Sequence, residues 1–360
     1  MPDHPLSTPT ATNPSSPASP PWLAEYVGVI DARVSSLFGS GSSSLETAVR
    51  GALQGGKRIR AVLALLWCEA VAGGYEKAVP VAVAYELAHA AALVQDDILD
   101  DSGFRRGERS IVGRHGLQSA ILASNLLLAQ VPREIAGYGS SDAGGETLRR
   151  LFDLLGESFG AAVLGEFLDL EMAERETVGR DDYEYMIKMK TGALVAASSA
   201  SGVVVGGGLG MEATVRAAYG FGEWLGMAYQ VHDDLLDIVG DEETLGKPVF
   251  ADIRGGKKNI VLIHALERSS QDDRAFLLGL LGRRGAGNGK AKEGEEGSGF
   301  DESEVRRVRD LLERSGSVGY AQGMAASYAE NARMLLDTTV AGASRQKLLE
   351  LSDYLASRKY

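Results

Sequence analysis

The sequence has almost no cysteine. Cys68 is the only one among 360 residues, which excludes a disulfide framework and a cysteine-based zinc site. A reducing cytoplasm is the simplest compartment for such a chain. The N-terminus also lacks the basic start and apolar core of a signal peptide, so we expect a cytoplasmic protein.

Basic residues are in short supply. Lys and Arg number 37 against 49 Asp and Glu, which gives a formal net charge of −12. Such a balance argues against nucleic acid or an anionic membrane surface as a non-specific partner. An anionic substrate would therefore need a local cluster of basic groups or metal ions.

Long hydrophobic runs and β-type alternation are missing as well. The longest uncharged run, 191–211, is rich in Gly and Ser and has no sustained Leu/Ile core, so it is a poor membrane span. The stretch 203–205 is too short and too flanked by glycine to predict a strand. Apolar residues instead recur at three- and four-residue spacings from Trp22 onward. The pattern predicts an all-α protein.

Proline and glycine mark two segments outside the expected fold. Residues 1–21 hold most of the ten prolines, with Ser, Thr and Ala between them, which predicts a disordered tail. Residues from about 282 to 300 are rich in Gly, Lys and Glu, which predicts a flexible surface loop. We expect the rest of 22–360 to form a single domain.

Two clusters of aspartates dominate the remaining pattern. The first runs from Asp96 to Asp101 at the end of an apolar stretch, and a near copy runs from Asp233 to Asp237 after another apolar segment. Their sequences are Asp96-Asp97-Ile98-Leu99-Asp100-Asp101 and Asp233-Asp234-Leu235-Leu236-Asp237. On a helix Asp96 and Asp100 lie one turn apart on one face, and Asp97 and Asp101 form a second such pair.

Carboxylates so close together repel one another unless a cation neutralises them. Hard oxygen ligands of this kind suit Mg²⁺, which takes one or two carboxylates together with substrate phosphates and waters. A lone acidic cluster is more often a solvated helix end. Here two D-D-x-x-D motifs each end an apolar helix, which predicts facing carboxylate walls with metal ions between them.

Basic side chains stand near these clusters in the sequence. Gly55-Gly56-Lys57-Arg58-Ile59-Arg60 opens a helix that we expect over Ala61–Ala72, and glycines with basic residues at a helix start suit a phosphate. The guanidinium groups of Arg105 and Arg106 can bind two phosphate oxygens at once. Lys190 stands among apolar residues, where an unpaired charge would be costly, so it favours an anionic partner. His89 lies two turns before Asp96, a position more often held by a satisfied core histidine.

These motifs resemble those of the trans-isoprenyl diphosphate synthase family. The resemblance rests on Asp-Asp-Ile-Leu-Asp with a following Arg-Arg-Gly, and on Gln-Val-His-Asp-Asp-Leu-Leu-Asp downstream, and it runs from about Leu53 to Leu336. It implies an isoprenoid-synthase-type bundle of long helices around a central apolar cavity. It further implies Mg²⁺-dependent head-to-tail condensation of isopentenyl diphosphate with an allylic diphosphate, and a homodimer.

The resemblance also implies roles for single residues. Asp96, Asp100, Asp233 and Lys190 would carry the catalysis. The residues that it places on metal are Asp96, Asp97, Asp100, Asp101, Asp233 and Asp237. The residues that it places on isopentenyl diphosphate are Lys57, Arg60, His89 (in Glu86-x-x-His89) and Arg106. The residues that it places on the allylic diphosphate or beside it are Arg105, Lys190, Thr191, Gln230, Lys247 and Lys257.

The chain departs from the family pattern at several positions. Ala61 stands where proline usually follows the basic motif, and Asn259 replaces the usual threonine. In Gly165-Glu166-Phe167-Leu168-Asp169, glutamate replaces glutamine. That change adds a negative charge near the expected site, and the sequence provides no reason for it.

Three other functions compete with this interpretation. A class I terpene cyclase would share the first motif, but its second normally carries Asn, Ser and Glu ligands where this chain has aspartates. An HD-type phosphohydrolase would use His232 and Asp233, but the other histidines lack the spacing it needs. A non-catalytic partner subunit of a heteromeric synthase usually loses one aspartate motif, and this chain keeps both.

The length of the product depends on side chains below the first aspartate motif. In the family, bulky aromatics four and five positions before the first aspartate stop elongation early, and this chain has Ala91 and Ala92 there. Tyr85 is the next large side chain, roughly 16 Å below Asp96 at about 1.5 Å per residue. With about 4–5 Å for each five-carbon unit, the spacing predicts a twenty-carbon product, geranylgeranyl diphosphate. A product of twenty-five carbons or more is expected if Tyr85 turns away.

Overall fold

Helices make up nearly all of the chain that can be described. The structure is a computed structural model and describes residues 19–38, 43–105, 107–138, 144–207, 210–240, 249–282, 300–337 and 339–357. The helices up to the first aspartate motif are α1 (Leu23–Leu37), α2 (Ser44–Ala52), α3 (Ile59–Ala72), the 3-10 turn η1 (Glu76–Ala78) and α4 (Val79–Leu99).

A long central set of helices follows, ending in the second aspartate motif. These helices are α5 (Ile111–Tyr138), α6 (Gly145–Glu174), α7 (Arg180–Ile187), the π-helical turn η2 (Lys188–Gly192), α8 (Ala193–Gly207) and α9 (Glu212–Val239). The C-terminal helices are α11 (Ala251–Arg254), α12 (Ile260–Arg268), α13 (Gln271–Leu281), α14 (Glu302–Arg314), α15 (Ser317–Asp337) and α16 (Gly342–Ser357).

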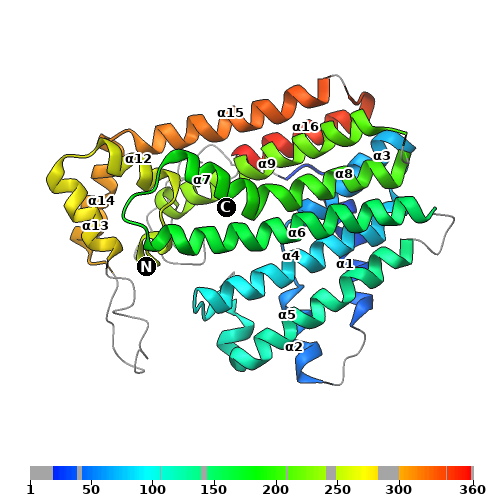
Figure 1. Ribbon diagram of the computed structural model, residues 1–360, viewed down its shortest axis with the longest axis horizontal. Coiled ribbons are helices and arrows are strands. Elements are labelled where there is room, and N and C mark those ends of the chain that lie inside the picture. Colours follow the sequence, from blue (N-terminus) through cyan, green and yellow to red (C-terminus); the bar gives the residue numbers. More distant parts are fainter. Residues whose placement is uncertain are drawn as a thin grey trace, which may run out of the picture.

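The long helices lie side by side, with their axes along the long dimension of the molecule (Figure 1). α8 lies between α3, α6 and α9 and is buried on every side from Ala193 to Val205. Its sequence explains this position, because a helix that is apolar or small all round has no face to present to water. Residues 193–207 of the uncharged run therefore form a close-packed core helix, as expected.

α4 carries the first aspartate motif through the core. Together with the preceding turn, the helix Glu76–Leu99 is long and apolar enough to cross a membrane, but 67% of its most apolar window is buried inside the protein. Its apolar faces pack against α3 and α5. The apolar residues of this stretch are therefore core residues, and the aspartates lie at the C-terminal end of the helix.

α4 ends two residues before Asp101, the last residue that the expected helical pairs of aspartates require. Leu99 is the last helical residue, Asp100 caps the helix, and Asp101 has a left-handed backbone with φ of 49°. The expected helical pair of Asp97 and Asp101 is therefore wrong. The C-terminal end of a helix is the negative end of its dipole and disfavours further carboxylates, which accounts for the early exit.

The expected all-α fold is confirmed, with one small exception. Two-residue strands β1 (Phe104–Arg105) and β2 (Glu108–Arg109) pair antiparallel between α4 and α5. The sequence did not predict this turn, since strands so short leave no alternation to detect.

Several expectations fall on residues outside those described. Most of the tail 1–21, nearly all of the loop 282–300, Arg106 and Lys247 are among these. The single domain expected over 22–360 stays a prediction.

Candidate active site

Two adjoining cavities lie between the long helices. The larger cavity, of about 490 Å³, is enclosed by α4, α6, α8, α9 and the π-helical turn η2. The smaller cavity, of about 70 Å³, lies beside the start of α3. The two share five lining residues: Arg60, His89, Leu93, Thr191 and Tyr229. A reaction between two substrates, one in each cavity, could therefore take place across this shared wall.

The larger cavity has carboxylates on two facing helices. Asp96 of α4 and Asp233 of α9 both line it, so the structure brings the two aspartate motifs together as expected. The expected metal ligands Asp97, Asp100, Asp101 and Asp237 are not among its lining residues. In the part of the chain that is described, no three Asp, Glu, His or Cys side chains form a ready-made metal site.

The other carboxylates of the first motif hold basic side chains in place. Buried Asp97 accepts a hydrogen bond from Nε of Arg105 at 2.8 Å, and Arg105 lines the larger cavity. Asp100 accepts a hydrogen bond from Nζ of Lys257 at 2.7 Å. Asp97 thus positions Arg105, and Asp100 brings Lys257 to the rim of the aspartate motif.

The second motif divides its three aspartates between the cavity and the protein interior. Asp234 is buried and accepts hydrogen bonds from the Tyr183 hydroxyl at 2.5 Å and from the Gln230 amide at 3.0 Å. Burial and the nearby Asp252 raise the pKa of Asp234 well above its usual range. The Asp237 carboxylate accepts hydrogen bonds from the backbone N–H groups of Ala251 (3.2 Å) and Asp252 (3.1 Å) at the start of α11. Only Asp233 faces the larger cavity.

Lys190 lies in the π-helical turn η2, between two carboxylates of α6. Its Nζ is 2.6 Å from Glu166 and 2.7 Å from Asp169. α6 can approach so closely because Gly165 has no side chain: a Cβ there would lie 2.2 Å from the backbone nitrogen of Lys190. Single-turn π segments are frequent at functional sites. Lys190 and Glu166 both line the larger cavity, so the lysine is held at its wall.

Burial and neighbouring charges shift the pKa values of this cluster in opposite directions. Burial raises the pKa of Glu166 to about 7, against the lowering effect of Lys190 and with a further rise from Asp96. Burial by itself would lower the pKa of Lys190, but Asp169 and Glu166 raise it above its usual range. The lysine stays charged, and Glu166 changes charge near neutral pH. Its Oε1 is buried and has no hydrogen-bond partner among the described residues.

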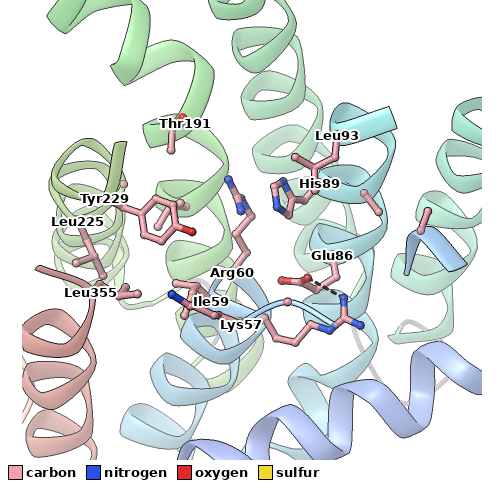
Figure 2. A pocket seen from close by; sticks show the side chains of 16 residues that line it. Lys57, Ile59, Arg60, Glu86, His89, Leu93, Thr191, Leu225, Tyr229 and Leu355 are labelled. Carbon is pink, nitrogen blue, oxygen red and sulfur yellow. Dashed lines mark hydrogen bonds and ion pairs between the residues drawn. The ribbon is translucent and has the colours of Figure 1, made fainter. Parts of the chain in front are cut away.

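The smaller cavity is basic. Lys57 precedes α3, Arg60 lies in its first turn, and His89 of α4 and Tyr229 of α9 face them. Figure 2 shows the Arg60 side chain reaching between Tyr229 and His89, with Lys57 below it. The expected residues Lys57, Arg60 and His89 are thus brought together in one cavity.

Arg60 has a buried donor without an acceptor. Its Nε makes no hydrogen bond within the described part of the protein, and burial lowers the pKa of its guanidinium. A buried unsatisfied donor carries a substantial cost, which an anionic ligand in the cavity would relieve. The residues therefore fit a phosphate-bearing substrate.

Arg58, between the two predicted ligands, has a different task. It has φ of 51° at the start of α3 and is only 7% exposed. Its guanidinium bonds Asp31 at 2.9 Å, Glu86 at 3.5 Å and the carbonyl of Leu53. These bonds hold the strained turn that presents Lys57 and Arg60. Sequence reasoning missed this role, since nothing in the motif separates Arg58 from its neighbours.

Thr191 and Gln230 form a pair on the wall of the larger cavity. The Thr191 hydroxyl donates to the Gln230 side-chain oxygen at 2.7 Å, and both residues line the cavity. The Gln230 amide group is also bonded to Asp234. This chain from the cavity to a buried aspartate fixes the orientation of the Gln230 amide.

Tyr85 does not limit the larger cavity. It is fully buried, its hydroxyl lies 2.9 Å from that of Ser201 on α8, and it is absent from the cavity lining. The expectation that Tyr85 forms the floor is therefore wrong. The α6 residues that line the cavity run from Leu170 down to Phe159, roughly 16 Å along the helix at about 1.5 Å per residue. Phe159 is the large side chain at the far end.

The comparisons with known proteins agree with this arrangement. Residues 42–295 match the family model for polyprenyl synthetase. The chain is 37% identical to a short chain isoprenyl diphosphate synthase of Methanothermobacter thermautotrophicus, over 85% of this chain and 87% of that protein. It is 34% identical to a geranylgeranyl pyrophosphate synthase of Geoglobus acetivorans, over 85% and 88%.

A solved structure is similar over almost the whole chain. The geranylgeranyl pyrophosphate synthetase from Pyrococcus horikoshii superposes with a TM-score of 0.81 at 32% identity, covering 93% of this chain and 97% of that one. The family match, the extent of these similarities and the two aspartate walls lead to one conclusion. The chain belongs to the polyprenyl synthetase family and is a prenyl-transferring enzyme.

Proposed function

We propose that the protein condenses isopentenyl diphosphate with an allylic diphosphate, with Mg²⁺ as cofactor, to give geranylgeranyl diphosphate. The observation that carries the proposal is the pair of adjoining cavities, one basic and one walled by Asp96 and Asp233. The similar proteins named as geranylgeranyl synthases support the product.

The donor set of the larger cavity fits Mg²⁺. Asp96 and Asp233 offer hard oxygen ligands from two helices, and Mg²⁺ ordinarily needs only one or two carboxylates when substrate phosphates and waters complete its shell. When bound, the metal ions offset charge on the diphosphate as it leaves. Asp97, Asp100, Asp101 and Asp237 assist from farther away. The contacts of Asp97, Asp100 and Asp237 suggest how: each holds another part of the site in place.

The chain's own cations act on the leaving group. Lys190 and Arg105 line the larger cavity and Lys257 stands at its aspartate rim, where they offset the charge that develops on the diphosphate. We expect Lys247, outside the described residues, to act with them. The C–O bond of the allylic diphosphate breaks with both electrons on the diphosphate, which leaves an allylic cation in the apolar cavity.

The second substrate approaches from the smaller cavity. Lys57, Arg60 and His89 hold the diphosphate of isopentenyl diphosphate there, and Arg106 completes this group by resemblance. The double bond attacks the allylic cation across the shared wall, which forms the new C–C bond. The proton then lost goes to the departing diphosphate, since no described side chain at the shared wall stands out as a base.

The test is an incubation of the purified protein with Mg²⁺, labelled isopentenyl diphosphate and each allylic primer, followed by sizing of the products. We expect a twenty-carbon end product. If none of the allylic primers reacts, the proposal is overturned, and a partner subunit without activity of its own is favoured. An end product of fifteen carbons, or of twenty-five and more, would overturn only the chain length.

We further propose a homodimer through the outer face of α5 and α6. Large apolar side chains are exposed along both helices: Leu117, Ile121 and Leu122 on α5, and Phe152, Val163, Leu164 and Phe167 on α6. Such a face marks a protein interface. Val163 and Phe167 also line the larger cavity, so a partner would cover its outer side. Leu122→Glu should yield monomers in light scattering, whereas a wild-type monomer would contradict the dimer.

The cytoplasm is the compartment that we propose. The single cysteine, Cys68, is buried and unpaired, which suits a reducing environment. Recovery of the native enzyme in the soluble cytoplasmic fraction of its own cells would test this.

A further inference from the structure

Lys258 is a buried lysine whose three donors are all used by one helix end. It is 7% exposed, and its Nζ donates to the backbone carbonyls of Met172 (3.0 Å), Ala173 (2.9 Å) and Arg175 (2.8 Å). These carbonyls belong to the last turn and cap of α6. An ammonium has three donors, and the C-terminal end of a helix attracts a cation. The contact therefore joins the segment between α11 and α12 to the end of α6.

The preceding residue, Lys257, reaches the active site instead. Its Nζ lies 2.7 Å from Asp100 and 4.0 Å from Asp169, and Asp169 in turn holds Lys190. Asp100 and Asp169 raise the pKa of Lys257 against the lowering effects of burial and of Lys190. The position of this ammonium depends on the position of the short segment between α11 and α12.

Other hydrogen bonds join this segment to α11, which precedes it. The backbone N–H of Lys257 donates to the carbonyl of Asp252 at 2.8 Å, and the Asn259 side chain donates to the Asp252 carboxylate at 3.0 Å. Both bonds shape the turn but do not fix it to α6. The Lys258 ammonium ties the turn to α6, the helix that carries Glu166 and Asp169, and its three hydrogen bonds are shorter than the 4.0 Å contact between Lys257 and Asp169.

We propose that Lys258 is a positioning residue that holds the Lys257 ammonium at the aspartate rim of the larger cavity. The inference rests on the proposed condensation, because Lys257 meets a diphosphate only if that proposal holds. Loss of the anchor should let the turn move relative to α6. The allylic substrate should then bind more weakly, while the smaller cavity, beside α3, should be unaffected.

A double-mutant cycle tests the proposal. The variants are Lys258→Met, Lys257→Met and the double variant, measured for KM of each substrate, kcat and thermal midpoint. Lys258→Met should raise KM for the allylic diphosphate by roughly tenfold. Loss of a residue that orients a metal ligand has an effect of about this size on affinity or activity. KM for isopentenyl diphosphate should stay within about twofold. The double variant should be no worse than Lys257→Met alone, because residues that act as a unit are not additive.

Lys347→Met is the matched control. Lys347 donates to Glu69 at 2.8 Å and to Tyr26 at 2.6 Å, away from both cavities, so its loss should lower the thermal midpoint without changing either KM. If Lys258→Met does not fold, Lys258→Gln, which keeps a shorter donor, takes its place with the same expected pattern. Additive effects in the double variant, or an equal rise of both KM values, would overturn the inference. A wild-type enzyme without turnover would instead defeat the proposed function.

Discussion

The two cavities differ in charge, and the difference separates two ways of binding a diphosphate. The smaller cavity presents Lys57, Arg60 and His89, and the buried Nε of Arg60 has no acceptor among the described residues. The larger cavity presents Asp96, Asp233 and Glu166 beside its cations. In the smaller cavity, protein side chains alone can balance the negative charge of a diphosphate. In the larger cavity the anion meets carboxylates, so cations from solution are needed as well.

The cavities also differ in size. The cavity beside α3 measures about 70 Å³, whereas the cavity of about 490 Å³ between α4, α6 and α9 has the room that the proposed growing chain needs. A net charge of −12 over the whole chain says nothing of this division. The local distribution of charge and volume supports the proposal that the two substrates bind in separate places.

The largest effect should come from breaking the carboxylate walls. Asp96→Ala and Asp233→Ala should each lower kcat by roughly 10²- to 10³-fold, since each removes a group that holds charge-stabilising metal. Thermal midpoints should change little, because repelling carboxylates are being removed. Asp153→Ala, at an exposed ion pair on α6, is the control. Near-normal turnover of either wall variant would contradict the two-wall arrangement.

Removal of Mg²⁺ should affect the two cavities unequally. In chelator, a non-reactive allylic diphosphate analogue should lose at least about 10²-fold in affinity, as expected when the metal counter-charges to a buried anion are removed. Isopentenyl diphosphate should still bind through Lys57 and Arg60. Isothermal titration with each ligand, with and without chelator, measures both. Equal losses for the two ligands would contradict the comparison.

Substitution of a basic side chain should raise KM mainly for the substrate of the cavity that this side chain lines. Lys57→Ala or Arg60→Ala should raise KM for isopentenyl diphosphate by roughly tenfold or more, the scale expected for one charge-assisted hydrogen bond. Lys190→Ala should raise KM mainly for the allylic substrate. Initial rates with each substrate varied in turn decide the point. A parallel rise of both constants in any of these variants would mean that the sites are not separate.

Product length should respond to the floor of the larger cavity. Phe159→Ala should lengthen the end product by at least one five-carbon unit, since it opens the far end of the lining. Ala92→Phe, on α4 and four residues before Asp96, should shorten it. Phe276→Ala, on α13 and outside the cavity lining, is the control. Chromatographic sizing that finds the same product in all variants would remove Phe159 from this role.

Glu166 should produce the smallest effect, visible in the pH profile. With a pKa raised to about 7, Glu166 is neutral below that pH and charged above it. KM for the allylic diphosphate should therefore rise as the pH increases through 7, by a few-fold. Glu166→Gln keeps an acceptor for Lys190 and removes the charge, so its KM should stay flat from about pH 6 to 8. An unchanged profile in this variant would assign the dependence to another group.

Much of the site could be predicted from the sequence, because the charge of a residue and its spacing along a helix depend only on nearby sequence positions. Asp96 and Asp233 were expected at the ends of apolar helices, and Lys57, Arg60 and His89 at a phosphate site. All of them line the cavities. The all-α fold followed in the same way, from spacings of three and four residues.

Other residues could not be assigned from spacing. Asp237 shares a helix face with Asp233, yet its carboxylate accepts the backbone N–H groups of α11. Tyr85 stands at a plausible depth below Asp96, but its hydroxyl meets Ser201 of α8 and Phe159 of α6 takes the position at the end of the cavity. Each of these outcomes depends on a neighbour far away in the sequence.

The sequence by itself determined which chemical groups the protein has and which of them lie on one face of one helix, since a helix repeats every 3.6 residues. Only the tertiary structure decided what each face meets. Gly165 permits a contact that places Glu166 and Asp169 against Lys190, and Lys258 closes the end of α6. The physical reason is that periodicity is a property of one helix, whereas burial, pairing and cavity depth arise where several helices pack together.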